Sequence, residues 1–150
     1  MPIHFEITTP EKTVYKEEVD QVTVPTSTGE ITILPNHIPL VSQLVAGELV
    51  VKRGDEITHM AVSGGFLEVR KNNEVVVLAD SAEKAEEIDT KRAEEARERA
   101  RQLMNGKRHD AEAFAEAVAE LEKSMARLKV AKRARHRGHH GLGSEGVLTE

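Results

Sequence analysis

The chain has 150 residues and a formal net charge of −5, with three Phe, one Tyr, no Trp and no Cys. The absence of cysteine excludes disulfides, thiolate metal sites and a catalytic thiol. Proteins that bind nucleic acid usually have a basic surface and aromatic side chains on which bases stack. An acidic chain with few aromatic side chains is poorly suited to this role. The N-terminal residues lack the pattern of a signal peptide, and no apolar run approaches the roughly 20 residues that span a bilayer. We therefore expect any contact with a membrane to be indirect.

The first part of the chain, residues 1–82, has the pattern of short β-strands. Apolar and polar residues alternate within short runs, and turn sequences rich in Pro, Gly and Asn separate these runs. The alternating apolar positions are Ile3, Phe5, Ile7, Val22, Val24, Ile31, Ile33, Leu49 and Val51. The continuous apolar run at 75–78 resembles a fully buried strand, and Gly64-Gly65 is interpreted as a tight turn between strands. The pattern predicts an antiparallel sandwich or barrel.

One loop of this part, LPNHIP at residues 34–39, is restricted by Pro35 and Pro39. Its tip carries Asn36 and His37. A rigid polar tip at the edge of a sandwich can serve as a contact surface. An ordinary turn with an incidental histidine explains the sequence equally well.

The second part, residues 83–137, has a helical pattern, because it consists largely of Ala, Glu, Lys and Arg. Asn105-Gly106 ends a first helix, and Asp110 can cap a second one. The apolar faces are Ala93, Ala96, Ala100 and Leu103 on the first helix, and Phe114, Val118, Leu121, Met125 and Leu128 on the second. This spacing predicts an antiparallel hairpin. Burial of apolar surface stabilises a fold by about 25 cal/mol per Å², and alanine side chains bury little of it. We therefore expect the hairpin to be marginally stable alone. We also expect it to dock on another surface, in more than one position.

The end of the second helix is strongly basic. Residues 123–137 contain seven Lys or Arg and no acidic residue. An acidic protein partner would relieve the repulsion among these cations and is the favoured interpretation. A solvated face, and binding to nucleic acid or lipid headgroups, remain the alternatives. The Gly-rich segment 138–150 has no apolar period and is predicted to be a disordered tail.

No catalytic constellation is visible. The sequence contains no P-loop and no HExxH motif, and Ser63-Gly64-Gly65 does not have the spacing of a nucleophile elbow. We therefore predict that the chain is not an enzyme.

Four segments resemble, in the same order, the epsilon subunit of F-type ATP synthases, and the resemblance extends from residue 3 to about residue 135. They are GEITILPNHIPLV (29–41), SGGFLEV (63–69), VLADSAE (77–83) and IDTKRA (88–93). The resemblance implies an α+β chain in two parts. An N-terminal antiparallel β-sandwich of about ten strands (1–82) is followed by a C-terminal antiparallel helical hairpin (83–137) and then by the tail (138–150).

The resemblance also implies a function. The family's epsilon subunit is a non-catalytic part of the rotor that couples the gamma subunit to the c-ring of a proton-translocating synthase. Its hairpin restrains ATP hydrolysis when it extends into the alpha/beta catalytic head. The implied location is peripheral, at the cytoplasmic face of the bacterial cell membrane. The implied c-ring contacts are Glu30, Pro35, Asn36 and His37. The implied catalytic-head contacts are Lys123, Arg127, Lys129, Lys132, Arg133 and Arg135.

In bacillus-type members, ATP binds the folded hairpin through the pattern Ile/Leu-Asp-x-x-Arg-Ala and stabilises it. The resemblance thus implies ATP as a regulatory ligand of this chain, and we expect no metal to be required. The positions that match their ligand contacts are Glu83, Ile88, Asp89, Arg92, Ala93, Arg99, Lys123 and Arg127. Lys123 departs from the family's Arg and offers a point charge instead of a planar fork. A stand-alone ATP-sensing module is the alternative function.

The spacing of these residues suits a triphosphate. Arg92 and Arg99 are seven residues apart and share one helix face, and Lys123 and Arg127 are four apart on the other helix. Glu83 and Asp89 could accept hydrogen bonds from adenine or orient an arginine. Purely structural pairs, Glu95–Arg99 and Glu94–Arg97, are the alternative interpretation of the first helix.

Overall fold

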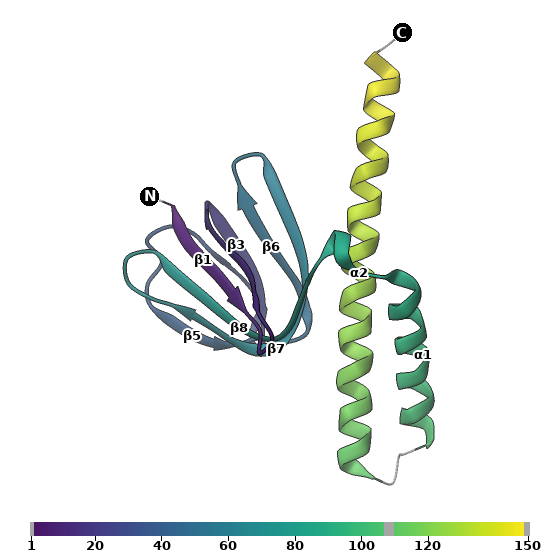
Figure 1. Cartoon of the computed structure of the whole chain (residues 1–150). Helices are drawn as coiled ribbons and strands as arrows, with labels where there is room; N and C mark the ends of the chain where they lie inside the picture. The colour runs from purple at the N-terminus through teal and green to yellow at the C-terminus, as the bar shows by residue number, and fades with distance from the viewer. Residues whose placement is uncertain (1, 107–109, 149–150) are drawn as a thin grey trace.

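The computed structural model describes residues 2–106 and 110–148, with side chains described up to residue 133. A β-sandwich is followed by two helices that lie beside it (Figure 1). The strands are β1 (Ile3–Thr8), β2 (Thr13–Val19), β3 (Gln21–Thr26), β4 (Gly29–Ile33), β5 (Leu40–Gln43), β6 (Gly47–Arg53), β7 (Glu56–Val69) and β8 (Glu74–Lys84). The helical elements are the single turn η1 (Ala85–Glu87), α1 (Thr90–Gly106) and α2 (Ala111–Leu148). The described residues thus form eight strands instead of about ten, and β8 extends past the predicted boundary at residue 82.

The strands are hydrogen-bonded in the order β2-β1-β8-β7-β6-β3-β4, with β5 paired to β7. The first half of β7 pairs with β6, its second half pairs with β5, and β8 follows it along most of its length. The pairings are antiparallel as predicted, except that β1 and β8 are parallel. Strands so far apart in the sequence have no short hairpin turn to impose an antiparallel direction.

The predicted turn at Gly64-Gly65 is wrong, because both glycines lie inside β7. Their φ angles are +59° and +113°, in the region that favours glycine. A Cβ atom on Gly65 would overlap the carbonyl oxygen of Leu78 on β8. At this point the pairing of β7 changes from β6 to β5. The two glycines therefore allow one continuous strand to pair with both neighbours.

The core of the sandwich contains the alternating apolar residues that the sequence predicts. All nine are buried except Ile31, which is partly buried. The run at 75–78 is different from the prediction: Val75 and Val77 are buried, but Leu78 is 55% exposed. The side chains of β8 alternate between the two faces of the sheet, and only one face lies on the core.

Tyr15, the only tyrosine of the chain, closes the core at β2. Its ring packs against Phe5, with ring centroids 5.8 Å apart, and the Lys84 Nζ atom lies 5.8 Å from its centroid. Burial, and next the negative charge of Glu17, raise the pKa of Tyr15 to about 12. The ring therefore stays neutral while it joins β1 and β2 to the end of β8.

The two helices form the predicted antiparallel hairpin (Figure 1). Ala93 and Ala100 are buried on α1, but Leu103 is 48% exposed, and on α2 the predicted seam residue Met125 is 51% exposed. Among the described side chains of α2, the buried ones are Ala117, Ser124, Ala126, Val130 and Ala131. The predicted seam is therefore wrong in part, because α2 packs against the sandwich as well as against α1.

The N-terminal cap of α2 agrees with the sequence prediction, but its C-terminal extent does not. The cap at Asp110 is confirmed, since the Ala113 N–H donates to Asp110 Oδ1 at 3.2 Å. Where the sequence predicts a disordered tail after Gly138, the backbone of α2 remains helical to Leu148. A helix that already exists extends without a new nucleation cost, and no proline interrupts this segment. No described helix is both long and apolar enough to cross a membrane.

Candidate functional site

A cavity of about 690 Å³ lies between the sandwich and the hairpin. Its volume falls in the range of small-molecule sites. Its walls come from the β1–β2 turn, the end of β8, and both helices. The lining residues are Thr9, Glu11, Lys12, Asp80, Ser81, Ala82, Glu83, Glu87, Arg92, Glu95, Ala96, Arg99, Glu120, Lys123 and Arg127. The cavity thus brings together five of the eight predicted ligand residues: Glu83, Arg92, Arg99, Lys123 and Arg127.

Arg127 and Glu83 form a two-point ion pair across this cavity. Arg127 Nε donates to Glu83 Oε2 at 2.6 Å, and Nη2 donates to Oε1 at 3.3 Å. The two side chains are only 18% and 35% exposed. Such a forked, partly buried pair is stronger than a surface contact. It fixes α2 to the end of β8 and neutralises the Arg127 charge.

The remaining basic side chains of the hairpin wall are not neutralised in this way. Among the described residues, Arg92, Arg99 and Lys123 form no ion pair. The alternative pairs Glu95–Arg99 and Glu94–Arg97 are likewise not formed in this part of the chain. Three cations on the wall are therefore available to an anionic ligand.

The cavity as a whole is mixed in charge. It is lined by five basic side chains (Lys12, Arg92, Arg99, Lys123 and Arg127) and six acidic ones (Glu11, Asp80, Glu83, Glu87, Glu95 and Glu120). An anionic group would therefore have to sit against the basic residues of the helices. The carboxylates offer acceptors to hydrogen-bond donors of the same ligand.

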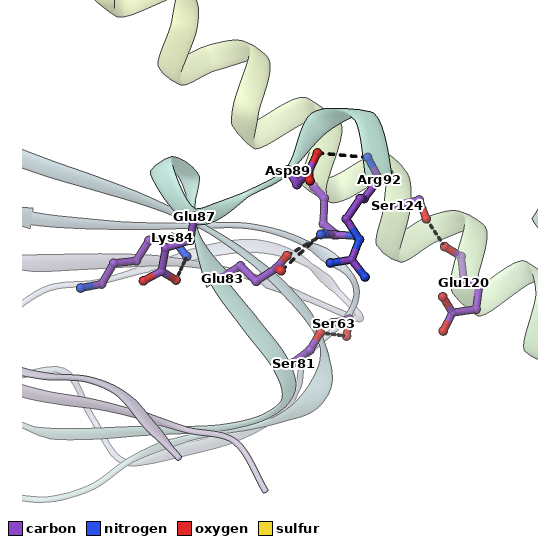
Figure 2. A network of polar contacts seen from close by, with 10 residues as sticks. Ser63, Ser81, Glu83, Lys84, Glu87, Asp89, Arg92, Glu120 and Ser124 are labelled. Atoms are coloured by element: carbon purple, nitrogen blue, oxygen red, sulfur yellow. Dashed lines mark hydrogen bonds and ion pairs between the residues drawn. The ribbon is translucent and has the colours of Figure 1, made fainter. Parts of the chain in front are cut away.

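The other three predicted ligand residues do not line the cavity and build the start of α1 instead. The Arg92 N–H donates to Asp89 Oδ1 at 3.2 Å, which makes Asp89 the N-cap of α1 (Figure 2). Ala93 is fully buried, and Ile88 packs against the small cluster Ala61, Ala85 and Val130. In this structure the motif therefore anchors, caps and packs the helix, and Arg92 is its one member in the cavity wall.

Apart from Glu83, no local sequence pattern points to the wall on the sandwich side. It consists of the β1–β2 turn and of Asp80, Ser81, Ala82 and Glu83 on β8. Thr9 holds the turn: its N–H donates to the Lys12 carbonyl at 2.9 Å, and its hydroxyl accepts from the Lys12 N–H at 3.3 Å. These residues reach the site only because the hairpin folds back on the sandwich.

The loop at 34–39 forms a second feature, at the edge of the sandwich. Asn36 has a φ of +66°, and its N–H donates to Asn73 Oδ1 at 2.6 Å. A cavity of about 630 Å³ lies beside it, lined by residues 36–39 and 71–73. Asn36 and His37 thus lie at this tip as predicted, and the 71–73 turn is a supporting loop that the sequence analysis missed. Glu30 lies apart from the cavity lining, exposed on β4.

The basic residues of α2 are divided between several environments. Lys123 and Arg127 line the cavity, and Arg133 forms an ion pair with Glu48 of β6. Lys129 and Lys132 are exposed. The side chain of Arg135 lies outside the described residues. The docked hairpin therefore directs part of its basic surface toward its own sandwich.

Both parts of the chain match families of known proteins. Residues 2–85 match the beta-sandwich domain of the ATP synthase delta/epsilon chain, and residues 86–132 match its long alpha-helix domain. The chain belongs to the ATP synthase delta/epsilon chain family. The resemblance inferred from the four sequence segments is confirmed.

Similar proteins support this assignment over nearly the whole chain. The ATP synthase epsilon chain of Dehalococcoides mccartyi is 51% identical over 89% of this chain and 94% of the relative. That of Herpetosiphon aurantiacus is 48% identical over 91% and 99%. A chain in the structure of the Euglena gracilis mitochondrial ATP synthase with OSCP, F1 and c-ring is 28% identical, with a TM-score of 0.74 over 87% of this chain and 81% of that chain.

Proposed function

We propose that the chain is the non-catalytic epsilon-type subunit of the central stalk of a proton-translocating F-type ATP synthase. It couples the gamma subunit to the c-ring, at the cytoplasmic face of the bacterial membrane. Its hairpin restrains ATP hydrolysis when released, and ATP stabilises the docked form. The observation that carries the proposal is the cavity between sandwich and hairpin, because a ligand there contacts both parts at once.

An apolar patch on the outer face of the sheet supports a stalk partner. Val41, Phe66 and Leu78 are 69%, 57% and 55% exposed. Phe66 and Leu78 are direct cross-strand neighbours of β7 and β8, and Val41 lies on the adjoining strand β5. Contiguous exposed apolar side chains mark interaction surfaces. We assign this patch to the gamma subunit.

We assign the tip at 34–39 to the c-ring. Replacing His37 with alanine is expected to weaken the coupling between ATP hydrolysis and proton pumping. The imidazole side chain at this tip is lost, while the backbone, held by the hydrogen bond between Asn36 and Asn73, stays in place. Proton pumping driven by ATP hydrolysis in membrane vesicles measures this effect. Lys16→Ala, on the exposed face of β2, is the matched control. Pumping at the control level, with normal assembly, would show that the tip does not contact the c-ring.

Truncation after Glu87 tests the inhibitory role of the hairpin. This point keeps β8 and η1 intact, whereas a cut after Ser81 would remove strand residues paired to β7. Hydrolysis by the assembled enzyme is expected to rise about fivefold or more, in the range of ordinary regulatory couplings. Unchanged hydrolysis by a fully assembled enzyme would contradict inhibition.

A stand-alone ATP sensor is the second candidate, favoured by the same cavity. ATP that binds only the docked state adds RT ln(1 + [L]/Kd) to its stability, about 2.7 kcal/mol when [L] is 100 times Kd. A stand-alone sensor would bind ATP in this way, but truncation after Glu87 would leave hydrolysis unchanged. The truncation therefore separates the two candidates.

A further inference from the structure

A buried carboxylate lies where α2 crosses the sandwich. The Glu48 side chain, on β6, is 5% exposed. Burying a charged carboxylate costs several kcal/mol unless a partner of opposite charge and hydrogen bonds compensate it. The partners of Glu48 therefore determine whether this part of the sandwich is stable.

The sandwich alone does not supply enough partners for the Glu48 carboxylate. His59 of β7 lies beside Glu48 and is 8% exposed. Its Nδ1 atom is 3.4 Å from Glu48 Oε2, but this contact is not a hydrogen bond. Neither ring nitrogen of His59, nor Glu48 Oε2, has a hydrogen-bond partner among the described residues.

The missing donor comes from the hairpin. Arg133 Nη1 donates to Glu48 Oε1, although the two residues are 85 positions apart in the sequence. One turn earlier on α2, Val130 is fully buried and packs with Ala61 and Ala85. The apolar contact places α2 on the sheet, and the ion pair fixes which part of α2 lies over Glu48.

We propose that Glu48, which lies beside His59, forms a receptor for a single guanidinium, and that Arg133 occupies it when the hairpin is docked. A planar guanidinium suits a carboxylate better than the point charge of lysine. Releasing the hairpin leaves Glu48 without its charged partner, so the pair favours the docked state.

The receptor also has a consequence for partner binding, which rests on the proposed function. Arg133 is one of the basic residues assigned to an acidic surface of the catalytic head. One guanidinium does not bind Glu48 and an external carboxylate at full strength at the same time. Glu48 therefore competes with the acidic partner for Arg133, and the sandwich masks part of the basic surface of α2.

The test measures docking in the isolated full-length chain. Because the sequence has no cysteine, cysteines introduced at the exposed positions Asp55 and Glu122 carry two spin labels at unique sites. Their distance distribution, measured by pulsed electron paramagnetic resonance, reports docked and released hairpins. Arg133→Ala is expected to lower the docked-to-released ratio at least about fivefold, since it strands a buried carboxylate while Arg133 itself is half exposed.

Lys132→Ala is the matched control, because it removes an adjacent exposed cation and should leave the ratio unchanged. Glu48→Gln, which keeps the side-chain shape, should lower the ratio like Arg133→Ala, and the double variant should be no worse than either single one. The proposal would be overturned if Arg133→Ala changed the ratio no more than Lys132→Ala does. It would also be overturned if the effects of Arg133→Ala and Glu48→Gln were fully additive in the double variant. Neither result would change the truncation outcome, so the two proposals fail separately.

Discussion

Gly65→Ala is expected to lower the free energy of unfolding by about 3 kcal/mol or more. The position has a φ of +113°, and an added Cβ would overlap the Leu78 carbonyl oxygen and lie 2.9 Å from the Ala79 Cα atom. These are backbone atoms of β8, so they have no side-chain rotation with which to yield. Urea unfolding followed by far-ultraviolet circular dichroism measures the loss.

Gly29→Ala is the matched control for backbone strain. Gly29 has a similar φ of +122°, but a Cβ there meets no heavy atom within 4 Å. It should cost only the strain of a left-handed residue, about 1–2 kcal/mol. If Gly65→Ala were no more destabilising than Gly29→Ala, the close approach of β7 to β8 would not be what requires glycine.

Binding of ATP to the isolated chain is expected to weaken by roughly 10- to 100-fold in Arg92→Ala and in Arg99→Ala. Each change removes a charge-assisted contact worth about 1.5–3 kcal/mol from the cavity wall. Isothermal titration calorimetry measures the affinity directly. Arg101→Ala is the control, because Arg101 is exposed on α1 and lies outside the cavity lining.

Lys123→Arg sharpens the same test. A guanidinium at this position can bind phosphate oxygens through two parallel hydrogen bonds, so affinity should increase. No heat with ATP in the unsubstituted chain, or equal affinity after Arg92→Ala, would rule out this cavity as the nucleotide site. The truncation experiment would still stand, because inhibition by the hairpin does not require a ligand.

The sequence by itself determined the two-part architecture and most of the core. Side-chain alternation at Ile3, Phe5 and Ile7 depends only on the local strand period, and the capping of α2 by Asp110 depends only on neighbouring residues. The spacing of Arg92 and Arg99 likewise placed them on one helix face, and both line the cavity.

Tertiary structure decided how these elements meet. Gly64-Gly65 is a turn signal by its composition, yet β8 pairs with β7 on both sides of it and keeps the strand continuous. The cavity needs the Thr9–Lys12 turn, and Glu48 needs Arg133, 85 residues later. Local patterns specify the period, the caps and the face of each element. They carry no information about which distant charge or strand edge will lie opposite, because that depends on the packing of the hairpin on the sandwich.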